Sequence, residues 1–187
     1  MGPAAVSDAV LEAAARLFAE SGVDAVSLRD IARAADVQLA LIGRYVGNRQ
    51  AVLDRVYLQL SAQVTAELEA KPLQQLDYGK DSVIGRWLAL STHYMTHGQV
   101  PPSDGANPVR TLAAMFEDSF GLEPRVARIR GAQVAAVTIG WRLFEEYFLA
   151  SGEFDPGELD ELREDVTAIQ RRIASTPWPT PPASPEA

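Results

Sequence analysis

Apolar residues recur at the spacing of an α-helix along most of the chain, and strand-like alternation persists nowhere. In the first predicted helix, residues 7–21, these positions share one face, and Gly22 then provides a stop. Ser27, followed three residues later by Asp30, has the pattern of a capping box with the shorter acid. This pattern predicts the start of a second, short helix.

Two more helices are predicted to follow closely. After a tight break at residues 36–37, the apolar spacing predicts a third short helix over residues 38–46, closed by Gly47. Asn48 is then expected to cap a long fourth helix that continues until Pro72. Two short helices joined by a minimal turn and braced on either side have the layout of a helix-turn-helix DNA reader.

The second half of the chain keeps the helical period. A loop rich in proline and glycine covers residues 98–108, and Asp155 followed by Pro156 marks the start of the last helix. From Thr176 onward the chain is rich in proline, which predicts an extended, disordered tail. The helices predicted in this half are residues 81–96, 109–119, 124–151 and 156–175.

Composition narrows the class of protein. The 187 residues include no cysteine, which excludes disulfides, thiolate metal sites and cysteine nucleophiles. No apolar run approaches the roughly 20 residues of a membrane-spanning helix, and no basic and apolar export signal opens the chain. We therefore expect a soluble, cytoplasmic protein with no membrane partner.

The net charge of −8 argues against a protein that binds nucleic acid over its whole surface. Between residues 37 and 50, however, the only charged side chains are Arg44 and Arg49, and Arg29 and Arg33 lie just upstream. Any contact with DNA is therefore expected within this stretch.

The ordered set of residues from Leu11 to Ala14, Leu17 to Gly22, Ser27 to Ala32 and Val37 to Leu53 resembles the N-terminal domain of the TetR family. The resemblance covers about residues 8–55. It implies an all-α fold with a three-helix helix-turn-helix DNA-binding domain and a C-terminal helical domain for ligand binding and dimerisation. The DNA-binding domain would cover residues 1–48, and the ligand-binding and dimerisation domain would cover residues 49–175. The fourth helix connects the two domains, and residues 176–187 form the tail.

The same resemblance implies a function. A homodimer is expected to bind a pseudo-palindromic operator in double-stranded DNA and to repress transcription until a small, largely apolar effector releases it. Nothing in the resemblance implies a cofactor.

The chain departs from the family pattern at several positions of the DNA reader. Asp36 stands where the family usually has glycine, and Gln38 where it has serine or asparagine. Gly43 replaces the usual tyrosine or histidine, and Val46 replaces phenylalanine. Gly43 removes a side-chain contact, but it also lets the backbone approach the DNA groove closely.

The third helix has one face for the core and one for DNA. If Val37, Ile42 and Val46 face the core, the neighbouring side chains point outward. Glutamine pairs with adenine, arginine with guanine, and leucine with the methyl group of thymine. Ser27, Tyr45 and Arg49 match family positions that hold phosphates. The predicted DNA-contacting residues are Ser27, Arg29, Gln38, Leu39, Ala40, Gly43, Arg44, Tyr45 and Arg49.

In the C-terminal half, residues 126–149 form a long apolar segment rich in small residues. With the last helix it could build the four-helix bundle of a dimer, or it could be an ordinary core helix of one chain. A ligand pocket is implied by the resemblance, although its candidate residues are equally suited to a plain core. These candidates are Trp87, Tyr94, Met95, Met115, Phe116, Trp141 and Phe144.

Other chemistry finds little support. His93 and His97 lie one helical turn apart with Asp104 downstream, but without a nearby glutamate or cysteine no metal site is predicted. No catalytic constellation is found, and Glu145 and Glu146 point in different directions on a helix, so an enzyme is not expected. The competing interpretation is an all-helical small-molecule-binding or interaction protein whose DNA reader has decayed.

Overall fold

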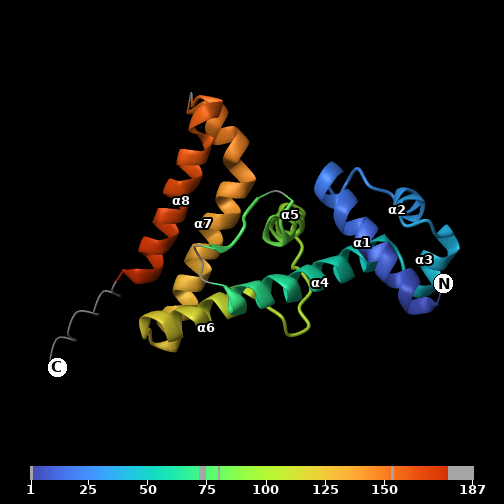
Figure 1. Ribbon diagram of the computed structural model, residues 1–187, viewed down its shortest axis with the longest axis horizontal. Coiled ribbons are helices and arrows are strands. Elements are labelled where there is room, and N and C mark those ends of the chain that lie inside the picture. Colours follow the sequence, from blue (N-terminus) through green and yellow to red (C-terminus); the bar gives the residue numbers. More distant parts are fainter. Residues whose placement is uncertain (1, 72–74, 80, 153, 177–187) are drawn as a thin grey trace. The chain divides into compact units, whose positions relative to one another are not determined.

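The computed structural model describes residues 2–71, 75–79, 81–152 and 154–176, and these residues form helices and connecting segments without a strand (Figure 1). The all-α prediction is confirmed. The helices are α1 (Pro3–Ser21), α2 (Leu28–Ala34), α3 (Leu39–Tyr45), α4 (Arg49–Ala70), α5 (Val83–Thr96), α6 (Pro108–Phe120), α7 (Pro124–Ser151) and α8 (Leu159–Ser175).

The chain packs as two compact units, divided between Thr111 and Leu112. In the first unit, α1 contacts α2, α3, α4 and α5, so it is the helix around which the others assemble. Val10, Ile31, Ile42 and Val52 are fully buried and come from four different helices. The two short helices are therefore held by a shared core, because helices of seven residues are not stable alone.

Polar contacts fix how α5 lies on α4. The hydroxyl of Tyr94 donates a hydrogen bond to Asp54 Oδ1 at 2.6 Å, and Trp87 Nε1 donates one to Ser61 Oγ at 3.0 Å. The Tyr57 ring meets that of Tyr94 edge to face at 5.3 Å. Burial and the neighbouring Asp54 carboxylate raise the pKa of Tyr94, so its hydroxyl stays a donor.

Arg55 of α4 joins three helices of the first unit. Its Nη1 donates a hydrogen bond to the carbonyl oxygen of Tyr45 at 3.1 Å, and its Nη2 donates one to Ser7 Oγ at 2.9 Å. Tyr45 ends α3 and Ser7 lies on α1. One side chain thus sets the end of α3 relative to the two longest helices of this unit.

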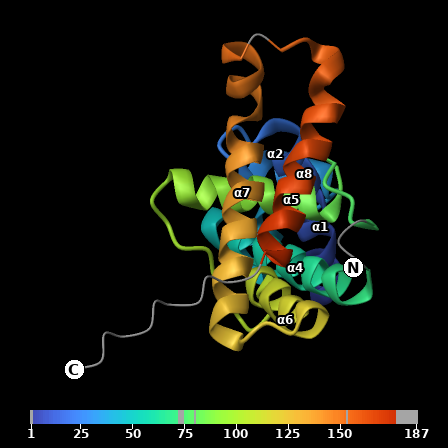
Figure 2. The ribbon, with the colours of Figure 1, turned by 90° about the vertical axis from the view of Figure 1, so that its left-hand side faces the viewer.

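In the second unit, α7 and α8 run side by side in opposite directions (Figures 1 and 2). Arg163 of α8 donates two hydrogen bonds to the Glu145 carboxylate of α7, at 3.2 and 2.8 Å. Gln170 Nε2 donates one to Thr138 Oγ1 at 2.7 Å. Part of the pair's surface is apolar and exposed: Leu143, Phe144, Tyr147, Phe148 and Ile169.

Most predicted helix boundaries agree with the structure to within two residues. Residues 124–151 form α7 as predicted, whereas α1 begins at Pro3 rather than at residue 7. Proline is favourable in a first helical turn, and this turn precedes the apolar stripe that the prediction followed. The predicted helix over 156–175 opens with a 3₁₀ turn, Pro156–Glu158, capped by Asp155. Residues 177–187 of the predicted tail lie outside the described residues.

In the part of the chain that the structure describes, no helix is long and apolar enough to cross a lipid bilayer.

Candidate nucleic-acid interface

Ser27 opens the candidate interface as the N-cap of α2. Its Oγ accepts a hydrogen bond from the backbone N–H of Asp30 at 3.3 Å, and Asp30 Oδ2 accepts one from the backbone N–H of Ser27 at 3.1 Å. The hydrogen bond from the Ser27 hydroxyl, and to a smaller extent the one from the Ser27 backbone N–H, lower the pKa of Asp30 below its usual value. The predicted capping box is therefore confirmed, and it fixes where α2 begins.

Asp36 forms the turn between α2 and α3 with a φ angle of +52°. This is the left-handed region, which glycine adopts freely and which aspartate tolerates better than most other residues. The carbonyl oxygen of Ala32 accepts a hydrogen bond from the N–H of Val37 at 3.0 Å and closes the turn. The position at which the family resemblance expects glycine is therefore one where the backbone favours it.

The third helix has its predicted orientation. Ile42 is fully buried, and Val37 and Val46 on either side of the helix are half-buried. The outward face carries Gln38, Leu39, Ala40, Gly43 and Arg44, all of which are exposed. The Leu39 side chain is 41% exposed. The exposed face thus combines donors, an acceptor and an apolar side chain.

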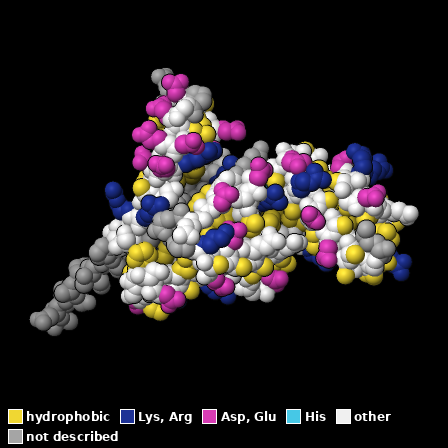
Figure 3. All heavy atoms as spheres, viewed as in Figure 1, with side chains coloured by type: hydrophobic (Ala, Val, Ile, Leu, Met, Phe, Trp, Pro, Cys, Tyr) yellow, Lys and Arg dark blue, Asp and Glu magenta, His cyan; other side chains and the backbone are white. Residues whose placement is uncertain are grey.

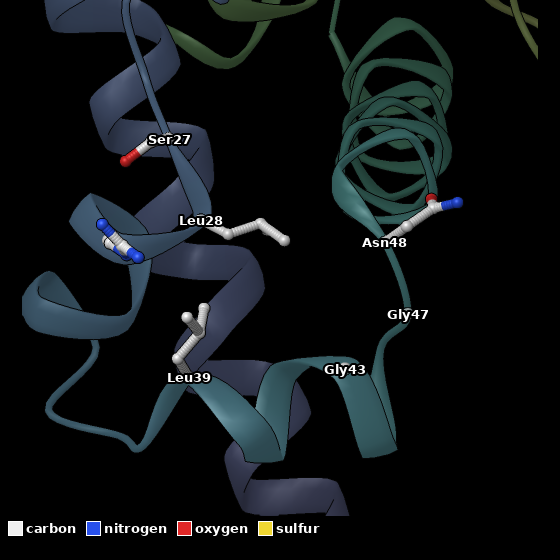
Figure 4. A pocket seen from close by; sticks show the side chains of 7 residues that line it. Ser27, Leu28, Leu39, Gly43, Gly47 and Asn48 are labelled. Carbon is white, nitrogen blue, oxygen red and sulfur yellow. The ribbon is translucent and has the colours of Figure 1, made fainter.

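An open hollow lies between α3 and the first turns of α2 and α4 (Figure 4). Figure 4 shows the Leu28 and Leu39 side chains directed into this space, with Gly43 and Gly47 on the backbone beside it. A Cβ atom added at Gly43 would meet no atom within 4 Å. The residues that line the hollow are Ser27, Leu28, Arg29, Leu39, Gly43, Gly47 and Asn48.

Arginines supply the positive charge near this face. Arg29, Arg33 and Arg44 are exposed, and the Arg44 guanidinium lies 5.4 Å from the centroid of the Tyr45 ring. Arg33 pairs with Asp30 at 3.5 Å. In the second unit, acidic side chains instead gather on the surface of α8 (Figure 3). The excess negative charge of the chain is thus not spread evenly, and the α3 face has arginines of its own.

Arg49, a predicted phosphate contact, is held by the protein itself. Its Nε donates a hydrogen bond to the carbonyl oxygen of Val26 at 3.1 Å, and its Nη2 donates one to the carbonyl oxygen of Val23. Both carbonyls belong to the loop that leads into α2. Arg49 therefore positions this loop against the start of α4, in addition to any contact with DNA.

The other phosphate candidates differ in how available they are. The Ser27 hydroxyl is engaged in the capping box, Tyr45 is half-buried, and Arg29 is exposed. Asn48 Oδ1 caps α4 by accepting a hydrogen bond from the N–H of Ala51 at 2.9 Å, as predicted. The DNA contacts of this set remain predictions.

Sequence reasoning missed Leu28, Gly47 and Asn48 as lining residues of the hollow. Leu28 follows the cap Ser27, and Asn48 precedes Arg49. Because both residues lie next to predicted DNA contacts, the sequence could have indicated that they belong to the interface. Their convergence on one hollow depends on how α2, α3 and α4 pack, which local pattern does not reveal.

The predicted ligand-lining residues are divided between the two units. Trp87 and Tyr94 are buried in the first unit against α4, and Met95 is 46% exposed. In the second unit Phe116 is buried, Met115 and Trp141 are half-buried, and Phe144 is 47% exposed. Trp141 Nε1 donates a hydrogen bond to Glu145 Oε2 at 2.8 Å. A ligand-binding role for these residues remains a prediction.

Comparison with known proteins agrees with this geometry. Residues 10–56 match the model of bacterial regulatory proteins of the tetR family. The chain is 30% identical over 172 residues to the HTH-type transcriptional repressor Rv3405c of Mycobacterium tuberculosis (strain H37Rv), covering 90% of this chain and 88% of that protein. The HTH-type transcriptional regulator Mb3439c of Mycobacterium bovis matches to the same extent.

Solved structures share the fold. A TetR-family transcriptional regulator from Streptomyces coelicolor superposes with a TM-score of 0.54 at 20% identity, over 90% of this chain and 99% of that chain. A TetR variant from Acinetobacter baumannii AYE, solved in complex with minocycline, gives a TM-score of 0.50 at 20% identity, over 90% and 94% of the two chains. At such low identity these matches support the helical architecture.

Proposed function

Because this chain belongs to the TetR family of DNA-binding transcriptional regulators, we propose that it is a repressor which binds its operator as a homodimer and leaves it when a small molecule binds. The relatives are named as transcriptional regulators, and no enzymatic activity is proposed. The observation that carries the proposal is the α3 face, where Ile42 is buried while Gln38, Leu39 and Arg44 are exposed.

The exposed α3 residues have the chemistry of base recognition in the major groove. The amide of Gln38 can pair with adenine through two hydrogen bonds, and the guanidinium of Arg44 can pair with O6 and N7 of guanine. Leu39 can contact a thymine methyl group. With Gly43 exposed between them, the backbone of α3 can lie close to the base edges.

Phosphate contacts would set the register of the reader on the duplex. We assign Arg29 to this role because it is exposed at the start of α2, next to the hollow. The proposed phosphate contacts also include Ser27, Tyr45 and Arg49. Ala40 is proposed as part of the DNA-facing surface. Arg49 would contribute mainly through the loop whose carbonyls it holds. Residues 1–48 are the DNA-binding domain in this proposal.

The exposed apolar side chains on α7 and α8 support a dimer. Phe144, Tyr147 and Phe148 are each at least 40% exposed, and such a row on a helical pair favours a second copy that completes a four-helix bundle. A two-fold dimer would place two α3 helices in successive major grooves, and its operator would then be an inverted repeat.

The proposed effector is a small, largely apolar molecule bound within residues 49–175. A TetR protein of the same fold was solved with minocycline, which shows small-molecule binding in that protein. In this chain the candidates are the predicted aromatic and methionine residues. The effector would have to favour the non-binding arrangement by a few kcal/mol to release the operator.

The proposal is tested by selecting binding sites from a random double-stranded DNA library with the full-length protein at two salt concentrations. Enrichment of an inverted repeat, bound more weakly at the higher salt concentration, is expected. The enriched site then serves as the probe for effector screening. We place the protein in the cytoplasm in this proposal, where the chromosome is accessible.

A second candidate function follows from the exposed glycine at position 43, which leaves the centre of α3 without a side chain to contact a base. In that case the chain is a helical small-molecule-binding or interaction protein with a decayed reader. Binding that is weak, sensitive to salt and without any enriched sequence supports this alternative and contradicts the repressor proposal.

A further inference from the structure

Three side chains with metal-binding atoms converge in the first unit, and none of them lines the α3 hollow. Asp24 lies in the loop between α1 and α2, and His93 and His97 lie at the end of α5. One ligand atom from each of the three lies within 4.8 Å of the other two. The sequence showed the two histidines, but Asp104 was the only carboxylate near them along the chain.

The distances fit the coordination of one ion. Asp24 Oδ2 lies 3.7 Å from His93 Nδ1 and 3.5 Å from His97 Nε2. Two ligands of a tetrahedral zinc ion, each about 2.0–2.1 Å from the metal, are about 3.3 Å apart. Shifts of a few tenths of an ångström along these two edges would therefore give the Asp24 oxygen and each imidazole nitrogen the separation of two ligands on one zinc ion. The two imidazole nitrogens lie within 4.8 Å of each other.

A backbone hydrogen bond prepares His97 for this role. His97 Nδ1 lies 2.8 Å from the carbonyl oxygen of His93, where it can only act as a donor. In the neutral imidazole the proton is then on Nδ1 and the lone pair is on Nε2, which lies 3.5 Å from Asp24 Oδ2. Metal-binding histidines in proteins are oriented in this way by a carbonyl or carboxylate partner.

His93 packs closely against His97 within the cluster. Its side chain is only 12% exposed, and its ring centroid lies 4.1 Å from that of His97. His93 is therefore the least exposed of the three side chains.

The loop that carries Asp24 is held in place on both sides. The Val23 and Val26 side chains are buried, and their carbonyl oxygens accept the hydrogen bonds of Arg49. The Asp24 side chain itself is 70% exposed. Its carboxylate therefore projects from a fixed backbone toward the end of α5, with an open side for solvent ligands.

From this geometry we propose that Asp24, His93 and His97 bind a divalent transition-metal ion of the zinc type, with water completing the coordination. Two imidazole nitrogens and one carboxylate oxygen suit Zn²⁺, whereas Mg²⁺ and Ca²⁺ prefer sites made of oxygen ligands. The bound ion ties the end of α5 to the loop that leads into Ser27 and α2.

The test uses the full-length protein without a polyhistidine tag, because the chain has only two histidines and no cysteine. Zinc chloride is titrated while the ring signals of both histidines are followed by NMR. One equivalent is expected to shift both imidazoles and to raise the thermal midpoint of unfolding. The variant Asp24→Asn is expected to bind Zn²⁺ at least about tenfold more weakly, a loss of the size that disturbed metal sites show.

The matched control is Asp104→Asn, which removes an exposed carboxylate outside the cluster and should leave zinc affinity unchanged. The double variant His93→Gln, His97→Gln defines the background. Three results would each overturn the proposal. The histidine signals stay unchanged when zinc is added, the wild type binds zinc no more tightly than the double variant does, or Asp24→Asn binds zinc as tightly as the wild type. A protonated imidazole paired with Asp24 gives the first of these results. The titration contains no DNA, so its outcome is separate from that of the operator selection.

Discussion

Arg49 Nε donates a hydrogen bond to the backbone carbonyl of Val26, 3.1 Å away, and thereby joins the first residue of α4 to the loop before α2. The same guanidinium also reaches the carbonyl of Val23. A lysine would supply the charge without this forked geometry. Arg49 therefore affects DNA binding through the position of α2, whether or not it also contacts a phosphate.

We expect Arg49→Ala to lower the free energy of unfolding by about 1–2 kcal/mol, since two charge-assisted hydrogen bonds to the loop are lost. Operator and random DNA should both be bound more weakly, because register rather than base recognition is affected. Urea unfolding and DNA titrations measure the two effects. Arg128→Ala, at an exposed position of α7, is the control. Unchanged stability would show that the two hydrogen bonds contribute nothing in solution.

Arg44→Ala should act on specificity. Loss of a bidentate contact to guanine is expected to reduce discrimination at one base pair of each half-site by about 1–3 kcal/mol. Arg44→Lys keeps the charge but not the planar fork, so it should retain affinity for random DNA and still lose discrimination. Site selection repeated with each variant measures this. An identical enriched sequence for all three proteins would exclude Arg44 as a base-reading residue.

The sequence was sufficient for features that depend on residues close in the chain. The Ser27–Asp30 capping box, the Asn48 cap and the inward direction of Ile42 each depend on spacings of three or four residues and on helical periodicity. The hydrogen bonds of Arg49 to carbonyls 23 and 26 residues away could not be predicted, because they depend on how α4 packs beside the loop.

The same limit applies to the acidic partner of the histidines. Helical periodicity places His93 and His97 on one face of a helix, and it favours partners nearby in sequence. Asp24 reaches them because α1 packs against α5. Local patterns contain no information on that contact.

Gly43→Ala separates helix stability from DNA approach. The added Cβ atom meets nothing within 4 Å, so the free protein should be more stable by up to about 1 kcal/mol from helix propensity alone. If the backbone of α3 approaches the base edges closely, operator affinity should nevertheless fall. Thermal unfolding and operator titration are compared in the same buffer. Ala40→Gly, also on the exposed face, should show the opposite change in stability. Higher stability with unchanged affinity would argue against close approach at this position.

Asp36→Gly tests the strain in the turn. Because the φ angle of Asp36 is +52°, glycine should raise the free energy of unfolding by about 0.5–1 kcal/mol. Asp36→Ala, which lacks the tolerance of aspartate for this region, should lower it by a similar amount. Chemical denaturation of the three proteins measures the order of stability. Alanine as stable as glycine would mean that this backbone angle relaxes without cost.

The Glu145–Arg163 contact predicts a pH dependence for the pairing of α7 with α8. Burial raises the pKa of Glu145, but the hydrogen bonds and charge of Arg163, together with Trp141 and Arg142, outweigh it and leave the pKa below the ordinary value of 4.5. Because the pKa of Glu145 is lower in the folded state than in the unfolded state, its ionised form stabilises the fold at pH values above the unfolded-state pKa. This contribution is lost as the pH falls through the folded-state pKa.

Glu145→Gln should therefore be less stable than the wild type at pH 7, by about 1 kcal/mol since Arg163 is half exposed to solvent. The difference should begin to shrink below about pH 4.5, where the unfolded state takes up a proton, and should vanish as the pH falls through the lower pKa of the folded state. Glutamine can still accept the hydrogen bond from Trp141, so the comparison isolates the ion pair. Glu146→Gln, one residue along and exposed, should show no such difference. A destabilisation of Glu145→Gln that stayed constant from pH 7 to pH 3 would point to packing instead of charge.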